Sequence, residues 1–479
     1  MYTRAGRYIL CVSLVLLFSS VLLSAQSSAV ASSTDVNQRI ADLEKQLQEL
    51  KGELAAIRAS QAAPPQPSAL TASAQTPAGA QALASQAAAT TTAPAPPAGP
   101  LDGLASVLKG ATVTGLVDGY YQYNFNQPST RISGLRSFDQ RTNQFALNLV
   151  EIGLVKTPDA SARLGYNITL GFGDAMKIVN AADPDYLQFL KEGYLSYLAP
   201  LGKGLQIDAG KFVTPAGAEV IETNANMNYS RSLLFNFAIP FYHYGGRAKY
   251  TFSDKVALTG YMVNGWNDVV HDSNPLNNSI NGVPQPATGT IFPVITNNYT
   301  NSGMTGGLSL ALTPSKKLSF TETWLGGPGA TPVDGNNWRN LSDTVITYSP
   351  TGKLTLTANG DYGRSQNPIG AAFHGRPADW SGIAGYAKYQ FKPVYALAIR
   401  YEYYNDHTGI TTGTAQHVNE FTGTLERKFA QHLISRFEYR YDDSNKNFFS
   451  RGATRTAKTQ QTVTAGLIFV LEPDATPGK

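Results

Sequence analysis

Cysteine is nearly missing from this 479-residue chain: the single one is Cys11, inside an apolar N-terminal stretch. Once that stretch is removed, disulfides, thiolate nucleophiles and Cys-based metal sites are all excluded. Long hydrophobic runs are missing as well, because no apolar run of about 20 residues occurs beyond the N-terminus. The sequence therefore contains no internal transmembrane helix.

Charge is also scarce. Only 15% of the residues are charged, the net charge is +4, and no dense run of Lys or Arg occurs, so we expect no nucleic-acid partner. The six histidines show no metal-ligand spacing, and no HExxH, GxSxG or phosphate-loop motif is present. The Asp- and Asn-rich stretch 264–274 lacks the spacing of an EF-hand. We therefore expect no catalytic residue, no cofactor, no metal and no enzymatic activity.

The N-terminus is typical of a secretory signal peptide over residues 1–31. Arg4 and Arg7 precede an apolar stretch at 8–25, and the small residues Ala29 and Ala31 favour cleavage after Ala31. An uncleaved membrane anchor is the alternative interpretation. A secreted chain without cysteine suits passage through an oxidising periplasm.

A short heptad run follows at residues 32–58 and predicts a coiled coil that associates with further copies of the chain. A single amphipathic helix packed on another surface is the alternative, and Gly52 weakens either one. Residues 59–110, rich in Ala, Pro, Ser and Thr, predict a linker. The seam positions are Val36, Ile40, Leu43, Leu47, Leu50, Leu54 and Ile57.

The rest of the chain, residues 111–479, alternates apolar and polar residues with period two, as at 162–172, which is typical of β-strands. Short turns and long polar loops alternate between these segments, and that asymmetry indicates a transmembrane antiparallel up-and-down β-barrel. We predict sixteen strands, with fourteen or eighteen as alternatives, and a bulge in the second strand, where the alternation breaks. The predicted strands are 111–125, 143–156, 161–173, 186–199, 204–212, 241–252, 256–266, 303–313, 317–326, 341–349, 353–364, 380–391, 395–404, 417–427, 432–442 and 458–471.

Charged residues are expected to face the interior, since a charge turned toward the middle of the bilayer costs about 2–4 kcal/mol. This places Arg400 and Glu402 of one strand inside, together with Arg436, Glu438 and Arg440 of another. A barrel of about sixteen strands is too wide for side chains to fill, so it encloses an aqueous channel.

The long segment 213–240 carries too many apolar residues for an exposed loop tip, and we predict that it folds into the barrel and narrows it. Charges on this loop and on the wall could then set a field across the pore; the alternative is that they merely line a solvated wall. The candidates are Glu219, Glu222, Arg231, Arg247, Lys249, Arg400, Glu402, Arg436, Glu438 and Arg440.

The segment 207–268 resembles the β-barrel porin family described as OmpL-like. The resemblance rests on GKF at 210–212, TPAGAEV at 214–220, NYSRS at 228–232, the paired glycines at 245–246 and the opening VTGLVDGYYQYNFNQP at 113–128. It covers most of residues 111–471 and implies an outer-membrane porin.

Together these observations predict an outer-membrane channel of a Gram-negative-type bacterium that passes small hydrophilic solutes by diffusion. We expect a homo-oligomer, with a trimer favoured, surrounded by outer-membrane lipid and with the coiled coil in the periplasm. A non-conducting structural or adhesion barrel is the first alternative, and an outer-membrane enzyme is the second.

Overall fold

The computed structural model describes residues 107–181, 183–267, 304–328, 338–366, 376–430 and 432–471, together with residues 45, 48, 279–280 and 283–284. The predicted signal peptide, the heptad run and the linker up to residue 106 lie outside these described residues, apart from residues 45 and 48. Residues Pro94–Lys479 form one compact unit of the chain, and this unit contains the barrel.

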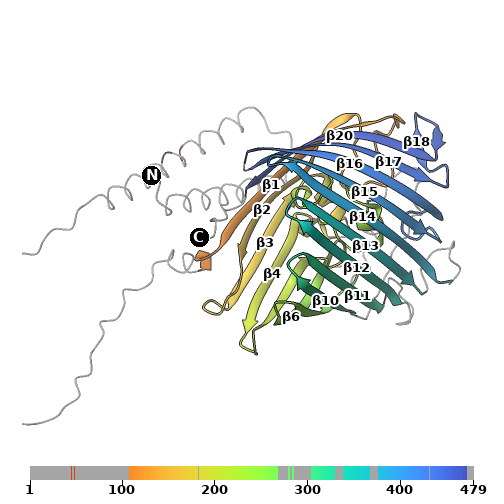
Figure 1. Cartoon of the computed structure of the whole chain (residues 1–479). Coiled ribbons are helices and arrows are strands. Elements are labelled where there is room, and N and C mark those ends of the chain that lie inside the picture. Colours follow the sequence, from red (N-terminus) through yellow and green to blue (C-terminus); the bar gives the residue numbers. More distant parts are fainter. Residues whose placement is uncertain are drawn as a thin grey trace, which may run out of the picture. The chain divides into compact units, whose positions relative to one another are not determined.

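Sixteen antiparallel strands close into a single barrel, with β20 paired to β1 (Figure 1). The predicted fold class and strand number are therefore confirmed. The strands are β1 (Thr112–Asn124), β2 (Gln144–Lys156), β3 (Leu164–Phe172), β4 (Leu190–Ala199), β5 (Leu205–Val213), β6 (Tyr242–Ser253), β7 (Val256–Val263), β10 (Thr305–Ser315), β11 (Leu318–Pro328), β12 (Trp338–Thr351), β13 (Leu354–Ser365), β14 (Ala378–Lys392), β15 (Tyr395–Asp406), β16 (Gln416–Ala430), β17 (Leu433–Ser444) and β20 (Thr459–Leu471).

Short elements occupy several of the predicted loops. These are α4 (Asp174–Val179), the 3₁₀ turns η1 (Asp185–Leu187) and η2 (Thr223–Ala225), the π-helical turn η3 (Leu234–Ala238) and the short strand pairs β8 (Ser279–Ile280) with β9 (Val283–Pro284) and β18 (Phe449–Arg451) with β19 (Arg455–Ala457). The fourth barrel strand begins at Leu190 rather than at 186, because Pro184 precedes the η1 turn with φ −57° and the chain turns before it extends.

The short turns are stabilised by side chains in the way that their composition predicts. Asp159 accepts hydrogen bonds from the backbone N–H groups of Ser161 and Ala162, at 2.7 and 2.8 Å, between β2 and β3. Thr351 accepts one from the N–H of Leu354, at 3.1 Å, between β12 and β13. Asp and Thr favour turns because their short side chains bond to the backbone a few residues further on.

The expected bulge in the second strand is present. The register between β1 and β2 shifts between Asp118 and Gly119, so that Asn148 is the extra residue. Asn148 and Leu149 are consecutive and both are fully buried, which a regular strand cannot achieve because its neighbours point to opposite faces. The bulge therefore restores the alternation on either side of it.

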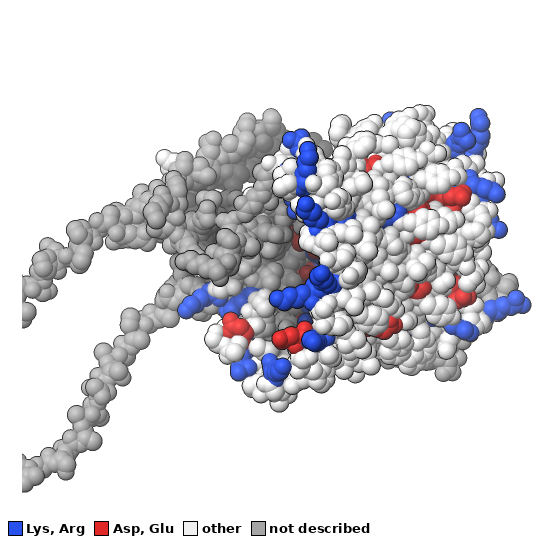
Figure 2. Space-filling model, in the orientation of Figure 1, with Lys and Arg blue, Asp and Glu red and all other residues white. Residues whose placement is uncertain are grey.

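Charged side chains of β15 and β17 point inward, as expected. Arg400, Glu402, Arg436, Glu438 and Arg440 are each at most 1% exposed. Their strand neighbours, such as Leu397, Tyr401 and Phe437, are exposed on the outer surface instead. Figure 2 shows Lys and Arg gathered toward the two ends of the barrel, with a wall between them that carries only scattered charges. Among the described residues, no helix has both the length and the apolar character to cross a membrane.

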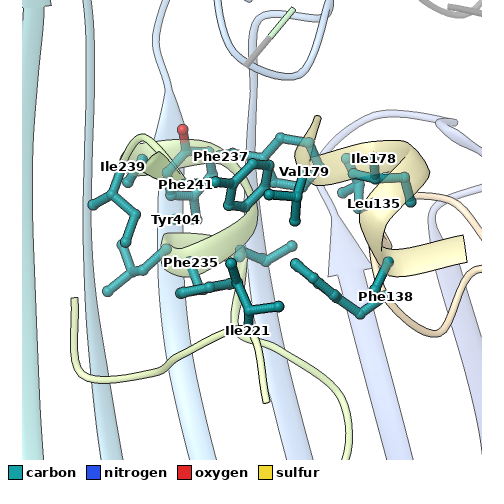
Figure 3. Close-up of a cluster of buried hydrophobic side chains, with 14 of the residues drawn as sticks. Leu135, Phe138, Ile178, Val179, Ile221, Phe235, Phe237, Ile239, Phe241 and Tyr404 are labelled. Atoms are coloured by element: carbon teal, nitrogen blue, oxygen red, sulfur yellow. The ribbon is translucent and has the colours of Figure 1, made fainter. Parts of the chain in front are cut away.

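A buried hydrophobic cluster lies inside the barrel (Figure 3). Leu135 and Phe138 come from the loop after β1, and Ile178 and Val179 from α4. They pack with Phe235, Phe237 and other side chains of the segment between β5 and β6. The rings of Phe138 and Phe235 lie 5.6 Å apart. The interior thus contains a small apolar core built by three loops.

Candidate pore constriction

The segment 214–241, between β5 and β6, is called the inner loop here. It folds against the inside of the barrel wall: Gly217 bonds to β12, Ala218 to β13, Leu233 to β15 and Asn228 to β16. Within the loop, the Asn226 side chain bonds to both the N–H and the C=O of Val220, at 2.9 and 2.8 Å. The sequence-based prediction placed this segment inside the barrel on its apolar residues alone.

Carboxylates of the wall accept hydrogen bonds from the backbone of the inner loop. Glu402 accepts from the N–H of Leu233 at 2.7 Å, and Glu438 accepts from the N–H groups of Tyr229 and Ser230 at 2.6 and 3.0 Å. Buried N–H groups need a partner, and the loop has neither a sheet neighbour nor a long helix to supply one. The wall carboxylates accept hydrogen bonds from these N–H groups instead.

Arginines of the wall donate hydrogen bonds to the carbonyl groups of the same loop. Arg436 donates to the carbonyls of Thr223, Asn226 and Asn228 at 2.6–2.8 Å. Arg400 donates to the carbonyl of Ser230 at 2.8 Å, and the carbonyl of Arg231 accepts from Arg440 at 2.6 Å. The planar guanidinium carries five donors in a fixed fork, which suits it to binding several acceptors at once.

The same arginines are paired with acids, so that their charge is compensated inside the protein. Arg400 lies 2.8 Å from both Glu219 and Glu420, Arg436 lies 2.8 Å from Glu426, and Arg440 lies 2.8 Å from Asp442. All of these side chains are at most 5% exposed. Removing one partner of such a buried pair typically costs about 3–5 kcal/mol, because the other charge is left unpaired.

Arg231 binds other residues of the inner loop rather than residues of the wall. Its guanidinium donates to the carbonyls of Val220, Tyr229 and Ile221 and lies 4.9 Å from the ring centre of Phe138. Nearby, the Tyr229 hydroxyl donates to Asp118 on β1 at 2.7 Å. Burial and the Asp118 carboxylate raise the pKa of Tyr229 well above its ordinary value, so its phenol keeps the proton that it donates.

One face of the inner loop remains open to solvent. Val220 is 41% exposed, Ala225 is exposed and the Glu222 side chain is 26% exposed. Glu222 forms an ion pair with Lys191 of β4, and Lys191 also lies 2.8 Å from Glu151 of β2. The loop therefore has a wall side held by charges and a solvent side that carries few of them.

The ten candidate residues fall into three groups. Seven of them are buried where the inner loop meets itself or the wall: Glu219, Arg231, Arg400, Glu402, Arg436, Glu438 and Arg440. Glu222 lies on the solvent side of the loop. Arg247 is bonded to Asp208 at 2.7 Å and Lys249 is exposed, both on β6 away from these contacts. The buried arginines and acids touch one another directly, and the influence of any of the ten on ion passage stays a prediction.

Several partners in this network were not among the candidates. Glu420 and Glu426 share the inward parity of β16, and Asp118 shares that of β1, so the alternation could have pointed to all three. Asp343, which accepts from the N–H of Gly217 at 2.9 Å, has the same kind of signal on β12. No group of three or more His, Cys, Asp or Glu that could hold a metal ion occurs in the described part of the chain.

Several solved structures are similar to this chain. The anion-selective porin of Comamonas acidovorans has 10% identity and a TM-score of 0.48, over 75% of this chain and 99% of that one. OmpF of Salmonella typhi, in complex with daunomycin, has 13% identity and a TM-score of 0.47, over 75% and 97%. The outer-membrane channel DcaP of Acinetobacter baumannii has 9% identity and a TM-score of 0.46, over 75% and 97%.

A search of curated proteins finds no significant match. The family model described as "Putative beta-barrel porin-2, OmpL-like" matches residues 110–471, which is more than half of the chain and confirms the predicted resemblance. This chain therefore belongs to that β-barrel porin family and is an outer-membrane porin.

Proposed function

We propose that the inner loop is the constriction of a passive channel, and that solutes pass its solvent side. The observation that carries this proposal is the division of the loop into two faces. Wall arginines and carboxylates bind the backbone on one side, while Val220 and Ala225 remain exposed on the other. A loop held in this way narrows the barrel without needing to move.

Polar and charged side chains that face the barrel interior, such as Lys249 and Lys388, favour small hydrophilic solutes. Exposed charges of the interior are candidates for setting ion preference: Lys249 of β6, Lys388 of β14 with 28% side-chain exposure, and Glu222 of the inner loop. The buried arginines and acids are paired with one another, and two of the exposed charges also have ion-pair partners: Lys388 lies 3.0 Å from Glu426, and Glu222 pairs with Lys191. We propose that Lys249, the most exposed of the three, gives the pore a preference for anions.

Single-channel conductance of the folded full-length protein, in a planar bilayer under a salt gradient, tests this function. Discrete steps are expected, with a reversal potential displaced toward that of the anion. A reversal potential displaced toward that of the cation contradicts the charge assignment but leaves the channel intact. Silence from a protein shown to be folded contradicts the channel itself.

A non-conducting structural or adhesion barrel is the second candidate. The observation that favours it is the apolar cluster of Figure 3, which occupies part of the interior. Silence in the bilayer, followed by conductance after Phe235→Ala and Phe237→Ala are combined, would support this candidate. An open channel in the unaltered protein contradicts the non-conducting barrel. An outer-membrane enzyme is the weakest alternative, because the sequence carries no GxSxG or HExxH motif.

We propose that several copies of the chain assemble in the outer membrane, with a trimer favoured. Residues 1–31 act as a cleaved signal peptide, residues 32–58 form a coiled coil in the periplasm, and residues 59–110 link it to the barrel. If the coiled coil strengthens the assembly, deletion of residues 32–60 lowers the fraction of oligomer in native gels. An unchanged oligomer assigns the association to the barrel walls alone.

A further inference from the structure

Glu322 is an ionisable side chain that points outward from the wall several residues from either end of its strand, β11. On β11, Thr323 and Leu325 are at most 2% exposed and face the interior, while Trp324 between them is 40% exposed on the outer surface. Glu322 has the same parity as Trp324 and therefore faces outward as well. Ionisable residues facing the bilayer are rare and usually mark a functional contact.

The position of Glu322 along the barrel wall is near the middle of the membrane-spanning band. Because strands in such barrels are tilted by about 35–45°, a row of paired residues across several strands climbs through the bilayer. The row through Glu322 has tyrosines at both ends and aliphatic or small residues between, as expected for two interfacial girdles with an apolar band between them. It runs Tyr250, Leu258, Leu310, Glu322, Thr344, Gly360, Ile383 and Tyr403.

The carboxylate of Glu322 is only partly satisfied by its own chain. The Ser342 hydroxyl donates to one oxygen at 2.6 Å, and the Thr344 hydroxyl donates to the other. An ionised carboxylate offers about four acceptor sites, and lipid chains supply no donor for the remainder. A protein surface that brings further donors would remove this deficit.

Two outward positions on the neighbouring strands β13 and β14 are glycines, Gly360 and Gly385. A side chain added at Gly385 would meet nothing within 4 Å, and one added at Gly360 would come no nearer than 3.9 Å to its surroundings. Neither glycine has the positive φ that would require glycine. Gly260 and Gly423 on other strands share this property, so the glycines mark this part of the wall only together with Glu322. Small residues on a membrane-facing surface allow another backbone to approach closely.

We propose that this outer patch, formed by Glu322, Trp324, Ser342, Thr344, Gly360 and Gly385, is a contact surface between copies of this chain. The Glu322 carboxylate keeps acceptor sites beyond the two filled by Ser342 and Thr344, and the exposed Trp324 indole is an N–H donor, so patches that meet across a symmetry axis of the assembly can pair one with the other. The heptad run at 32–58 independently predicts that copies of the chain lie next to one another. This inference rests on the proposed oligomer and names the surface that forms it.

The opposite part of the wall offers no such chemistry. The outward side chains of β3 include Leu164, Ile168 and Leu170, which are 37–70% exposed and purely apolar, as expected of a surface in contact with lipid. We therefore place lipid, rather than a second copy, against β3 and its neighbours. This contrast supplies the control for the experiment.

Cysteine cross-linking in intact outer membranes tests the surface, and the chain suits it because Cys11 is its single cysteine. We expect Gly360→Cys to form cross-linked dimers on mild oxidation or with a short bis-maleimide, and Ala209→Cys, which is exposed on the outer face of β5, to remain monomeric. Cross-linking of Ala209→Cys alone, or of neither variant while native gels still show an oligomer, overturns the outer patch but not the oligomer. A monomer in native gels overturns both.

A bulky substitution provides a second, independent measurement. Gly360→Trp should weaken the contact between copies. The protein concentration at which half of the oligomer dissociates in detergent should rise roughly tenfold, which corresponds to a tenfold lower association constant. Gly423→Trp is the matched control, because a side chain added at Gly423 on β16 also meets nothing within 4 Å. Unchanged single-channel steps in both variants establish that the barrels are folded. Equal dissociation of the two variants overturns the assignment.

Discussion

The two faces of the inner loop differ in what surrounds them. On the wall side, the backbone near Ser230 and Arg231 is bound by Arg400, Arg440 and Glu438, and almost no solvent reaches it. On the other side, Val220 and Glu222 contact solvent. Charges on the buried side therefore determine where the loop lies, whereas charges on the exposed side are free to act on a passing solute. Substitutions on the two sides should have separate effects.

The largest effect is expected from Arg231→Glu. The substitution places a carboxylate where the carbonyls of Val220, Ile221 and Tyr229 converge, and a buried charge without a partner costs about 3–5 kcal/mol. Unfolding in urea from lipid vesicles should show this loss, and single-channel steps should become larger and noisier as the loop leaves the wall. A clean shift of ion preference at unchanged conductance would show instead that Arg231 acts on passing ions.

A somewhat smaller loss is expected from Arg436→Ala, about 3 kcal/mol, at the lower end for a broken buried pair. This change removes three bonds to loop carbonyls and leaves Glu426 with Lys388 as its remaining cationic partner. The matched control is Arg427→Ala on the outer face of β16, which should change stability by less than about 0.5 kcal/mol. Equal losses from the two variants would contradict the role of Arg436 in holding the loop.

The smallest effect on stability is expected from Lys249→Glu. Lys249 is exposed inside the barrel, so its replacement should change the free energy of unfolding by less than about 0.5 kcal/mol. The reversal potential should nevertheless move toward that of the cation, since the sign of a lumen charge has been reversed. Lys255→Glu, in the turn between β6 and β7, is the control with the same change of charge outside the lumen and should leave the reversal potential unaltered.

Much of the barrel could be predicted from sequence because strand alternation is a local property. Arg400 and Glu402 share a parity, and an apolar bilayer admits only one orientation for that parity. The break at Asn148 and Leu149 was visible for the same reason. Glu420 and Glu426 could have been predicted to face inward in the same way, because they alternate with Phe421 and Leu425 along β16.

The partners of the buried charges could not be predicted in this way. Arg436 and the carbonyl of Thr223 are 213 positions apart in sequence, and no periodic pattern relates a wall residue to a loop that folds back upon it. The sequence placed the arginines on the inside of the barrel but did not indicate that the inner loop would cover them. Likewise, it indicated apolar residues at 233–237 without naming Phe138 or α4 as their neighbours.

The sequence by itself determined the barrel, a strand number of about sixteen, the inward and outward faces and the presence of a loop too apolar to remain in solvent. Each of these follows from period-two alternation and from the cost of placing charge against lipid. Only the tertiary structure decided that arginines and glutamates of β15 and β17 bind the backbone of the inner loop, and that Glu322 faces outward among small residues. Closure of the barrel brings those groups together, and closure depends on register and loop packing across the whole chain rather than on any local pattern.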